Sequence, residues 1–188
     1  CLDVIKMANK HPRVNIHQPG PGVGGHCLAI DPYFIYAKAP EEAKIIKLSR
    51  DTNCSMPQWV AEKTQMLLKG IENPKIAAFG VTYKGNVDDM RESPAVKIIQ
   101  LLKEKGLNVE IYDPHVNNDE LVDFETAIKG ADIILILTDH NEYKNMDFKV
   151  IESLMRTPVI FDTRNIVTED ENRNVKVINY GNIYKYKA

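Results

Sequence analysis

Short continuous runs of apolar residues alternate with segments of helical spacing through the second half of the chain. We expect buried strands in the apolar runs, at residues 76–81, 108–112, 132–138, 158–162 and 175–179. Between them, apolar residues recur three and four positions apart, which is typical of helices that bury one face. We expect these helices at residues 94–106, 121–129 and 148–155. This alternation predicts an α/β domain whose parallel sheet is covered by helices on both faces, as in Rossmann-like folds.

The first half of the chain has a different texture and no convincing strand. A short helix is expected at residues 41–50. A longer one is expected to begin at Ser55, a good N-cap residue, with Pro57 in the first turn where its missing N–H does no harm. We therefore divide the chain into a helical segment, residues 1–72, and an α/β domain, residues 73–188.

Ligands of such a sheet bind beyond the carboxyl ends of its strands. Three cationic side chains are expected there, namely Lys84 and Arg91 after the first strand and Arg164 after the fourth. Ammonium and guanidinium groups pair well with phosphate oxygens. Each of the three taken alone is equally well explained as a solvated loop charge, but three at one edge favour a phosphorylated ligand.

The composition is that of a soluble globular protein. Of the 188 residues, 44% are hydrophobic and 27% are charged, and the formal net charge is -2. No apolar run is long enough to cross a membrane, no signal peptide is evident, and no basic stripe with interleaved aromatic residues indicates nucleic-acid binding. The chain starts without Met, and residues 2–9 are typical of a helix already under way. We therefore expect a piece of a longer protein.

The three cysteines are widely spaced and include no Cys-x-x-Cys pair. This argues against a disulfide framework and a cysteine-rich zinc site, and it favours a reducing cytoplasm.

One loop combines closely spaced glycines with a cysteine and a carboxylate. It reads Gln18-Pro-Gly-Pro-Gly-Val-Gly-Gly-His-Cys-Leu-Ala-Ile-Asp31 and carries Cys27 four positions before Asp31. Glycines let a backbone turn sharply and approach a ligand closely, and a cysteine thiolate is a strong nucleophile. The alternatives are an ordinary turn and a small buried hydrophobic residue. Together, the residues favour a loop that holds a substrate against the sulfur.

The same loop contains G-x-G-x-x-G at Gly20, Gly22 and Gly25. A dinucleotide-binding fingerprint needs a strand before the glycines and a helix after them. Two prolines interrupt the lead-in, and we expect Asp31-Pro32 to break the segment that follows. We therefore interpret this match as accidental.

Three blocks of sequence resemble the UDP-glucose/GDP-mannose dehydrogenase family of nucleotide-sugar 6-dehydrogenases. They are Pro-Gly-Pro-Gly-Val-Gly-Gly-His-Cys-Leu-Ala-Ile-Asp-Pro-Tyr-Phe at 19–34, Phe-Gly-Val-Thr-Tyr-Lys-Gly-Asn-Val-Asp-Asp-Met-Arg-Glu-Ser-Pro-Ala at 79–95, and Phe-Asp-Thr-Arg-Asn at 161–165. The first block is most similar to the branch that oxidises UDP-N-acetyl-D-mannosamine. UDP-N-acetylglucosamine, UDP-glucose and GDP-mannose remain alternative substrates.

The resemblance implies a three-part protein with an N-terminal NAD-binding domain, a central domain that forms a homodimer, and a C-terminal UDP-sugar domain. Residues 1–72 correspond to the end of the central domain, and residues 73–188 to the C-terminal domain. The family oxidises an alcohol to an acid by two hydride transfers to NAD, through a thiohemiacetal and a thioester on cysteine. Cys27 falls on the nucleophile, and Asp31 on a carboxylate that positions or deprotonates water. Because the NAD domain is missing, we expect this piece alone to be inactive.

The resemblance also assigns binding roles by position. Arg91 and Cys27 fall near NAD, and His11 and Arg13 fall where relatives contact the substrate of a neighbouring subunit. The remaining positions match substrate contacts: Gln18, Gly20, Gly22 and Gly24 in the loop over the sugar nucleotide, and Tyr83, Lys84 and Arg164 in the α/β domain.

A non-catalytic nucleotide-binding module is the alternative from another functional class. In that reading residues 75–188 bind NAD at the turn after the first strand, and Asp113 binds a ribose at the end of the second. The turn, residues 80–85, lacks the G-x-G-x-x-G spacing, which disfavours this alternative.

Overall fold

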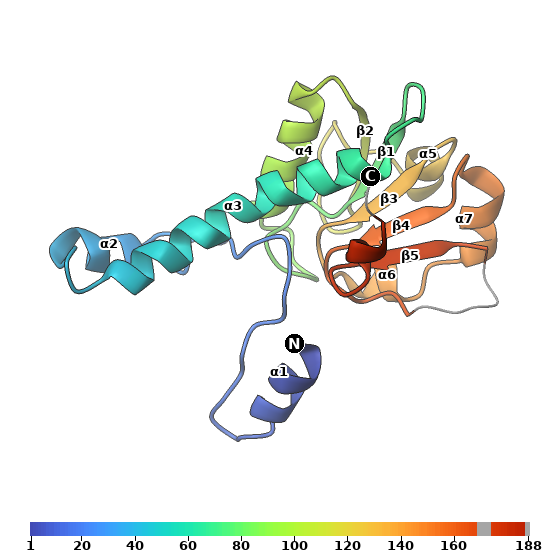
Figure 1. The fold of residues 1–188 in the computed structure, drawn as a ribbon. Helices are drawn as coiled ribbons and strands as arrows, with labels where there is room; N and C mark the ends of the chain where they lie inside the picture. Colours follow the sequence, from blue (N-terminus) through green and yellow to red (C-terminus); the bar gives the residue numbers. More distant parts are fainter. Residues whose placement is uncertain (169–173, 187–188) are drawn as a thin grey trace.

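The computed structural model describes residues 1–168 and 174–186, and its centre is a five-stranded parallel sheet (Figure 1). The strand order is β2-β1-β3-β4-β5, with every neighbouring pair parallel. The strands are β1 (Lys75–Phe79), β2 (Asn108–Tyr112), β3 (Ile133–Ile136), β4 (Val159–Asp162) and β5 (Lys176–Asn179). The predicted fold class, a parallel sheet with helices on both faces, is confirmed.

Seven α-helices and one 3₁₀ helix complete the described part of the chain. They are α1 (Leu2–Ala8), α2 (Asp31–Lys38), α3 (Lys44–Leu67), α4 (Pro94–Glu104), α5 (Phe124–Ile128), α6 (Asn141–Lys144), α7 (Phe148–Leu154) and η1 (Ile183–Lys185). Helix α4 begins as the sequence predicts, because the Ser93 hydroxyl accepts a hydrogen bond from the N–H of Ala95 and Pro94 occupies the first turn.

The sheet has a separate apolar core on each face. Helices α3 and α4 cover one face with residues such as Val60 and Ile98, and helices α5, α6 and α7 cover the other. All four residues of β3 are buried, as expected for a central strand covered on both sides. The carboxyl ends of the strands therefore form an edge that is held rigidly from both faces.

The prediction of two helices between residues 41 and 70 is wrong, because α3 is one continuous helix of 24 residues. Ser55 is not an N-cap; its hydroxyl donates to the carbonyl of Thr52 within the helix, at 2.8 Å. Pro57 lies inside the helix and is buried there. Burial of Val60 and Ala61 in the core against the sheet outweighs the backbone hydrogen bond that Pro57 removes.

Asp31-Pro32 was expected to break the chain after the glycine loop, and this is also wrong. Helix α2 begins at Asp31, with Pro32 in its first turn, where the missing N–H has no helical partner in any case. No strand precedes the glycines, since residues 10–30 contain neither helix nor strand. The dinucleotide fingerprint therefore still lacks its required strand.

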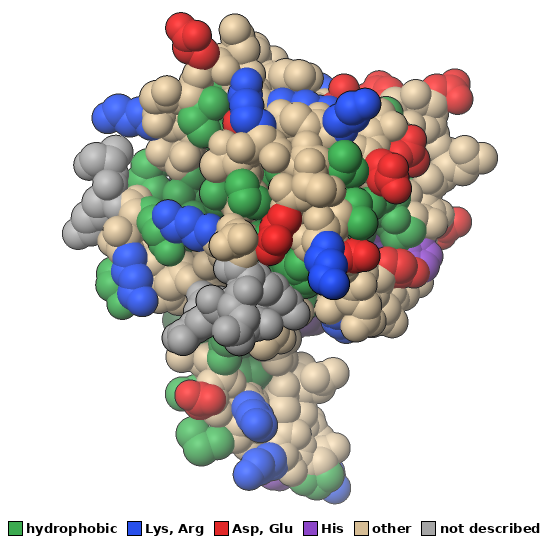
Figure 2. All heavy atoms as spheres, turned by 90° about the vertical axis from the view of Figure 1, so that its right-hand side faces the viewer, with side chains coloured by type: hydrophobic (Ala, Val, Ile, Leu, Met, Phe, Trp, Pro, Cys, Tyr) green, Lys and Arg blue, Asp and Glu red, His purple; other side chains and the backbone are tan. Residues whose placement is uncertain are grey.

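The N-terminal part of the chain stands away from the sheet. Helix α1 lies at the end of an extended segment, and the first turns of α3 project outward together with α2 (Figure 1). Several large apolar side chains are exposed here, including Val4, Met7, Phe34, Ile45 and Leu48. On the face of the molecule shown in Figure 2, basic and acidic side chains are interspersed.

Candidate functional site

A cleft of about 630 Å³ lies between the glycine loop and the carboxyl ends of the strands. It brings together seven of the predicted site residues, namely Gln18, Gly20, Gly22, Gly24, Tyr83, Lys84 and Arg164. Segments far apart in the sequence supply the remaining lining residues: Asn15, Ile16, His17, Pro19, Val23, Leu28, Asn53, Met56 and Asp139. The cleft thus lies where a parallel sheet binds its ligands.

The glycines of the loop are required by close packing. A Cβ on Gly20 would overlap the guanidinium of Arg164, and one on Gly24 would overlap the carbonyl of Glu92. Gly25 adopts a left-handed conformation with a φ of 85°, and its N–H donates to the carbonyl of Arg91. The loop can therefore lie directly on the residues that follow the strands.

A local network of hydrogen bonds holds Arg164 just after the carboxyl end of β4. The Asp162 carboxylate accepts hydrogen bonds from the N–H groups of Arg164, Ile166 and Val167, at 2.7 to 2.8 Å. The side chain of Arg164 is 17% exposed and forms an ion pair with Asp139 at 3.0 Å. Asp139 was not among the predicted site residues, although its place directly after the third strand run was a usable signal.

Asn53 is a second residue that the sequence reasoning missed. Its side-chain amide accepts from the N–H of Val23 at 2.7 Å and donates to the carbonyl of Val23 at 3.1 Å. Asn53 thereby joins the glycine loop to α3, and it also lines the cleft. The sequence places Asn53 between two expected helices, so no local pattern indicates this role.

Cys27 and Asp31 lie next to the cleft but not on its lining. Cys27 is exposed, and its neighbour Leu28 lines the cleft. The sulfur of Cys27 is 3.0 Å from Nδ1 of His26, and the N–H of Asp31 donates to the Cys27 carbonyl at 2.8 Å. A single turn therefore carries a thiol, an imidazole and a carboxylate, which are the residue types of a nucleophilic site.

Arg91, His11 and Arg13 are also placed outside the cleft lining. Arg91 binds the Asp89 carboxylate through Nε and Nη2, at 2.9 and 2.6 Å. The hydrogen bond from Arg91 lowers the pKa of Asp89 to about 2. His11 and Arg13 are exposed on the projecting N-terminal segment, where the N–H of Arg13 donates to Nδ1 of His11.

Asp113 does not fit the role of a ribose-binding carboxylate. It is buried, and it accepts hydrogen bonds from the N–H of Val81 at 2.8 Å and from Nε2 of His140 at 3.1 Å. The N–H of Asn86 donates to Nδ1 of His140, so His140 carries its proton on Nε2. Both oxygens of the Asp113 carboxylate are therefore already paired within the described residues, which disfavours a ribose contact there.

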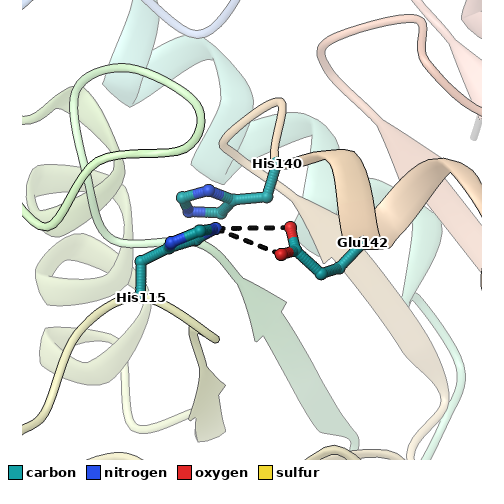
Figure 3. A group of neighbouring side chains, drawn as sticks. All are labelled: His115, His140 and Glu142. Atoms are coloured by element: carbon teal, nitrogen blue, oxygen red, sulfur yellow. Dashed lines mark hydrogen bonds and ion pairs between the residues drawn. The ribbon is translucent and has the colours of Figure 1, made fainter.

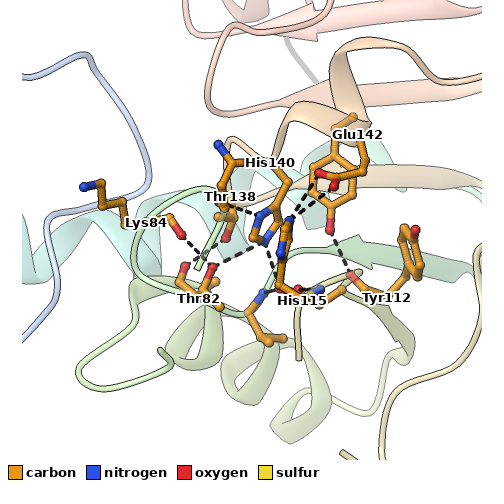
Figure 4. Close-up of polar contacts among 12 residues, drawn as sticks. Thr82, Lys84, Tyr112, His115, Thr138, His140 and Glu142 are labelled. Atoms are coloured by element: carbon orange, nitrogen blue, oxygen red, sulfur yellow. Dashed lines mark hydrogen bonds and ion pairs between the residues drawn. The ribbon is translucent and has the colours of Figure 1, made fainter. Parts of the chain in front are cut away.

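The same network fixes the loop that carries Lys84. The Thr82 hydroxyl donates to the carbonyl of Lys84, and the Thr138 hydroxyl donates to the carbonyl of Thr82, both at 2.8 Å (Figure 4). Gly80 permits this approach, because a Cβ there would overlap Thr138. The exposed ammonium group of Lys84 is thus presented from a rigid turn.

His115, His140 and Glu142 form a cluster in which ligand atoms lie within 4.8 Å of one another (Figure 3). It does not suit a cation. Nδ1 of His140 accepts from Asn86 and Nε2 faces Asp113, so this imidazole has no lone pair to offer. The two remaining side chains pair with each other at 3.3 Å.

The fold and the cleft define an α/β protein with a cleft at the carboxyl edge of its parallel sheet, and Lys84 and Arg164 line this cleft. The chain belongs to the UDP-glucose/GDP-mannose dehydrogenase family. The family model of the UDP binding domain matches residues 77–169, and the model of the central domain matches residues 1–55. Among the described residues, no helix is long and apolar enough to span a membrane.

Several curated relatives and solved structures are similar to this chain. UDP-N-acetyl-D-mannosamine dehydrogenase from Methanocaldococcus jannaschii is 49% identical over 173 residues, covering 89% of this chain and 40% of the relative. NDP-N-acetyl-D-galactosaminuronic acid dehydrogenase from Ralstonia nicotianae is 41% identical over 170 residues, covering 86% and 39%. A structure of UDP-N-acetyl-mannosamine dehydrogenase from Staphylococcus aureus has 52% identity and a TM-score of 0.85, covering 98% of this chain and 44% of that one.

The chain thus spans about 40% of the length of the curated relatives that it matches.

Proposed function

We propose that this chain supplies the nucleotide-sugar site and the nucleophile of an NAD-dependent dehydrogenase that oxidises UDP-N-acetyl-D-mannosamine to the uronate. The observation that carries the proposal is the cleft, which places Lys84 and Arg164 opposite the glycine loop that leads to Cys27. Residues 1–72 would be the end of the central domain and residues 73–188 the UDP-sugar domain.

The binding step follows from charge and shape. The Lys84 ammonium and the Arg164 guanidinium face the cleft from two strand ends, so they can neutralise the two phosphates of a nucleotide sugar. The ring of Tyr83 packs against Gly25 and offers an apolar surface to the ligand. The backbone of Gly20, Gly22 and Gly24 lines the cleft, and without side chains it would contact the sugar directly.

The chemical step centres on Cys27. The thiol must lose its proton before it attacks, and Nδ1 of His26 lies close enough to accept this proton. The sulfur then forms a bond to the aldehyde carbon of the sugar, and the carbonyl oxygen takes up a proton to give a thiohemiacetal. Asp31 belongs to the same turn, and its carboxylate would orient the water that later cleaves the thioester.

NAD would accept the hydrides of the two oxidation steps. Since Asp113 is already paired and residues 80–85 lack the G-x-G-x-x-G spacing, we expect most contacts with NAD to come from sequence outside this chain. Within this chain, Cys27 and Arg91 would lie next to the bound NAD.

We further propose a homodimer or higher homo-oligomer. The exposed apolar side chains of α1, α2 and the start of α3 would lie in contact with other protein, as large exposed apolar patches commonly do. His11 and Arg13 project in this region and would reach the substrate of a neighbouring subunit.

The test is an assay of the whole protein against a panel of UDP- and GDP-sugars, with NADH formation and uronate both measured. UDP-N-acetyl-D-mannosamine should give the highest kcat/KM, with two NADH released per uronate. A higher kcat/KM with UDP-N-acetylglucosamine, UDP-glucose or GDP-mannose would reassign the substrate. No NADH with any of these sugars would contradict the proposal.

A further inference from the structure

An acidic side chain lines a cleft that we propose binds a diphosphate. Oδ1 of Asp139, in the turn after β3, is 3.0 Å from Nη2 of Arg164. Asp139 and Arg164 are both among the lining residues. A carboxylate in this position repels a diphosphate. It would therefore weaken binding unless it has another effect on the cleft.

The backbone of Asp139 is fixed by close packing. A Cβ on Gly85 would lie 2.5 Å from the carbonyl oxygen of Asp139, so only glycine lets the two turns touch. On the other side of the pair, the Arg164 guanidinium lies against Gly20. The guanidinium is therefore held between an anchored carboxylate and the glycine loop.

The pair remains charged on both sides. Burial raises the pKa of Asp139 and is the largest single influence, but the positive charge of Arg164 and the hydrogen-bond donors around the carboxylate together bring the pKa below its ordinary value. The carboxylate is thus ionised at neutral pH and attracts the guanidinium continuously. Arg164 keeps Nη1 and Nε for another partner, because the contact to Asp139 uses Nη2.

We propose that Asp139 is a positioning residue that orients the guanidinium of Arg164 toward the diphosphate of the bound nucleotide sugar. This inference rests on the proposed function. A long arginine side chain that is ordered before binding loses less rotamer freedom when the ligand arrives. The cost of ordering one such side chain corresponds to about a two- to tenfold change in affinity, which sets the size of the expected effect.

The experiment is calorimetric titration of the whole protein and its variants with UDP. Asp139→Ala should bind UDP about two- to tenfold more weakly than the unchanged protein. Asp139→Asn should lose less, because its side-chain oxygen can still lie beside the Arg164 guanidinium while the negative charge is removed. Asp88→Ala, which removes an exposed carboxylate outside the cleft lining, should bind UDP normally. Thermal melting of each variant checks that it is folded.

A double-mutant cycle separates positioning from simple charge repulsion. If Asp139 acts through Arg164, then Asp139→Ala should not weaken UDP binding further in the Arg164→Ala background. Equal or tighter UDP binding by Asp139→Ala in the otherwise unchanged protein would overturn the inference. The same loss in both backgrounds would also overturn it. If the unchanged protein does not bind UDP at all, the proposed function fails together with the inference.

Discussion

The side-chain amide of Asn53 pairs with both backbone polar groups of Val23, as a neighbouring strand would. This pair holds the glycine loop on α3. Asn53 lies one helical turn before Pro57, in the middle of the continuous helix. The geometry of the cleft therefore depends on a residue of the long helix as well as on the sheet.

Asn53→Ala should loosen the glycine loop. The Val23 N–H and carbonyl would lose their partners, and each lost hydrogen bond costs about 1 kcal/mol. We expect the free energy of unfolding in urea to fall by about 1 to 3 kcal/mol and UDP to bind more weakly. Gln58→Ala is the matched control, because it removes an exposed amide that bonds Glu62 on the same helix. Equal effects of the two variants would show that Asn53 has no special role.

Cys27→Ser should abolish uronate formation by the whole protein, because a serine hydroxyl at neutral pH does not replace a thiolate as the nucleophile. Binding of UDP should be unchanged, since Cys27 is outside the cleft lining. Cys54→Ser is the control, because Cys54 is also an exposed thiol and lies on α3. Uronate formation at an undiminished rate by Cys27→Ser would remove Cys27 from the mechanism.

Gly20→Ala tests the close approach of the loop to Arg164. Gly20 is not in the left-handed region, so the added methyl group acts mainly by displacing the guanidinium that it would overlap. Loss of a charge-assisted hydrogen bond to phosphate should weaken UDP binding about tenfold or more. In Gly181→Ala the new Cβ meets only the Asn179 side chain, at 3.2 Å, and UDP binding should not change. Normal affinity in Gly20→Ala would contradict the described packing.

Asp132 at the opposite edge of the sheet predicts a pH dependence of stability. It is buried, accepts from the Lys75 N–H at 2.9 Å and pairs with the Arg156 guanidinium. Burial raises the pKa of Asp132, but hydrogen bonds from Arg156 and the Lys75 N–H, together with the charge of Arg156, bring it below its ordinary value. A pKa that is lower in the folded state gives stability that is present at neutral pH and is lost as the pH falls through that folded value.

The unfolding free energy should therefore decrease when the pH is lowered from about 5 to below 4. Asp132→Asn should destabilise the protein at pH 7 by about 1 to 3 kcal/mol. It should also make the unfolding free energy fall less steeply as the pH is lowered. Urea unfolding at several pH values measures both effects, with the exposed Asp119→Asn as control. If the unfolding free energy of Asp132→Asn fell with pH as steeply as that of the unchanged protein, the acid sensitivity would come from other groups.

Much of the α/β domain could be predicted because each element carries its own local signal. The run that became β3 is apolar at every position, and α4 has Ser93 and Pro94 at its start. The continuity of α3 could not be predicted, because Pro57 and Ser55 are local signals for a helix start. Tertiary burial of Pro57 and Val60 overrides these signals.

The charged residues and glycines that line the cleft could be named from the sequence. The contacts that hold them in place could not. Lys84 and Arg164 follow strands, and parallel topology alone brings such positions to one edge. The contacts of Asn53 with Val23 and of Asp139 with Arg164 span 30 and 25 positions, and no local pattern announces them. Asp113 shows the reverse case, in which a position typical of a ribose contact has an internal partner, His140.

The most direct test of the account is a titration of the 188-residue chain with UDP and, separately, with NAD. The cleft predicts that UDP binds at one site per chain and that Arg164→Ala weakens this binding about tenfold or more. NAD alone should bind poorly, because the Asp113 carboxylate is already paired with His140 and Val81 and is not free to bind a ribose. Tight binding of NAD with no binding of UDP would contradict the assignment of the cleft to a nucleotide sugar.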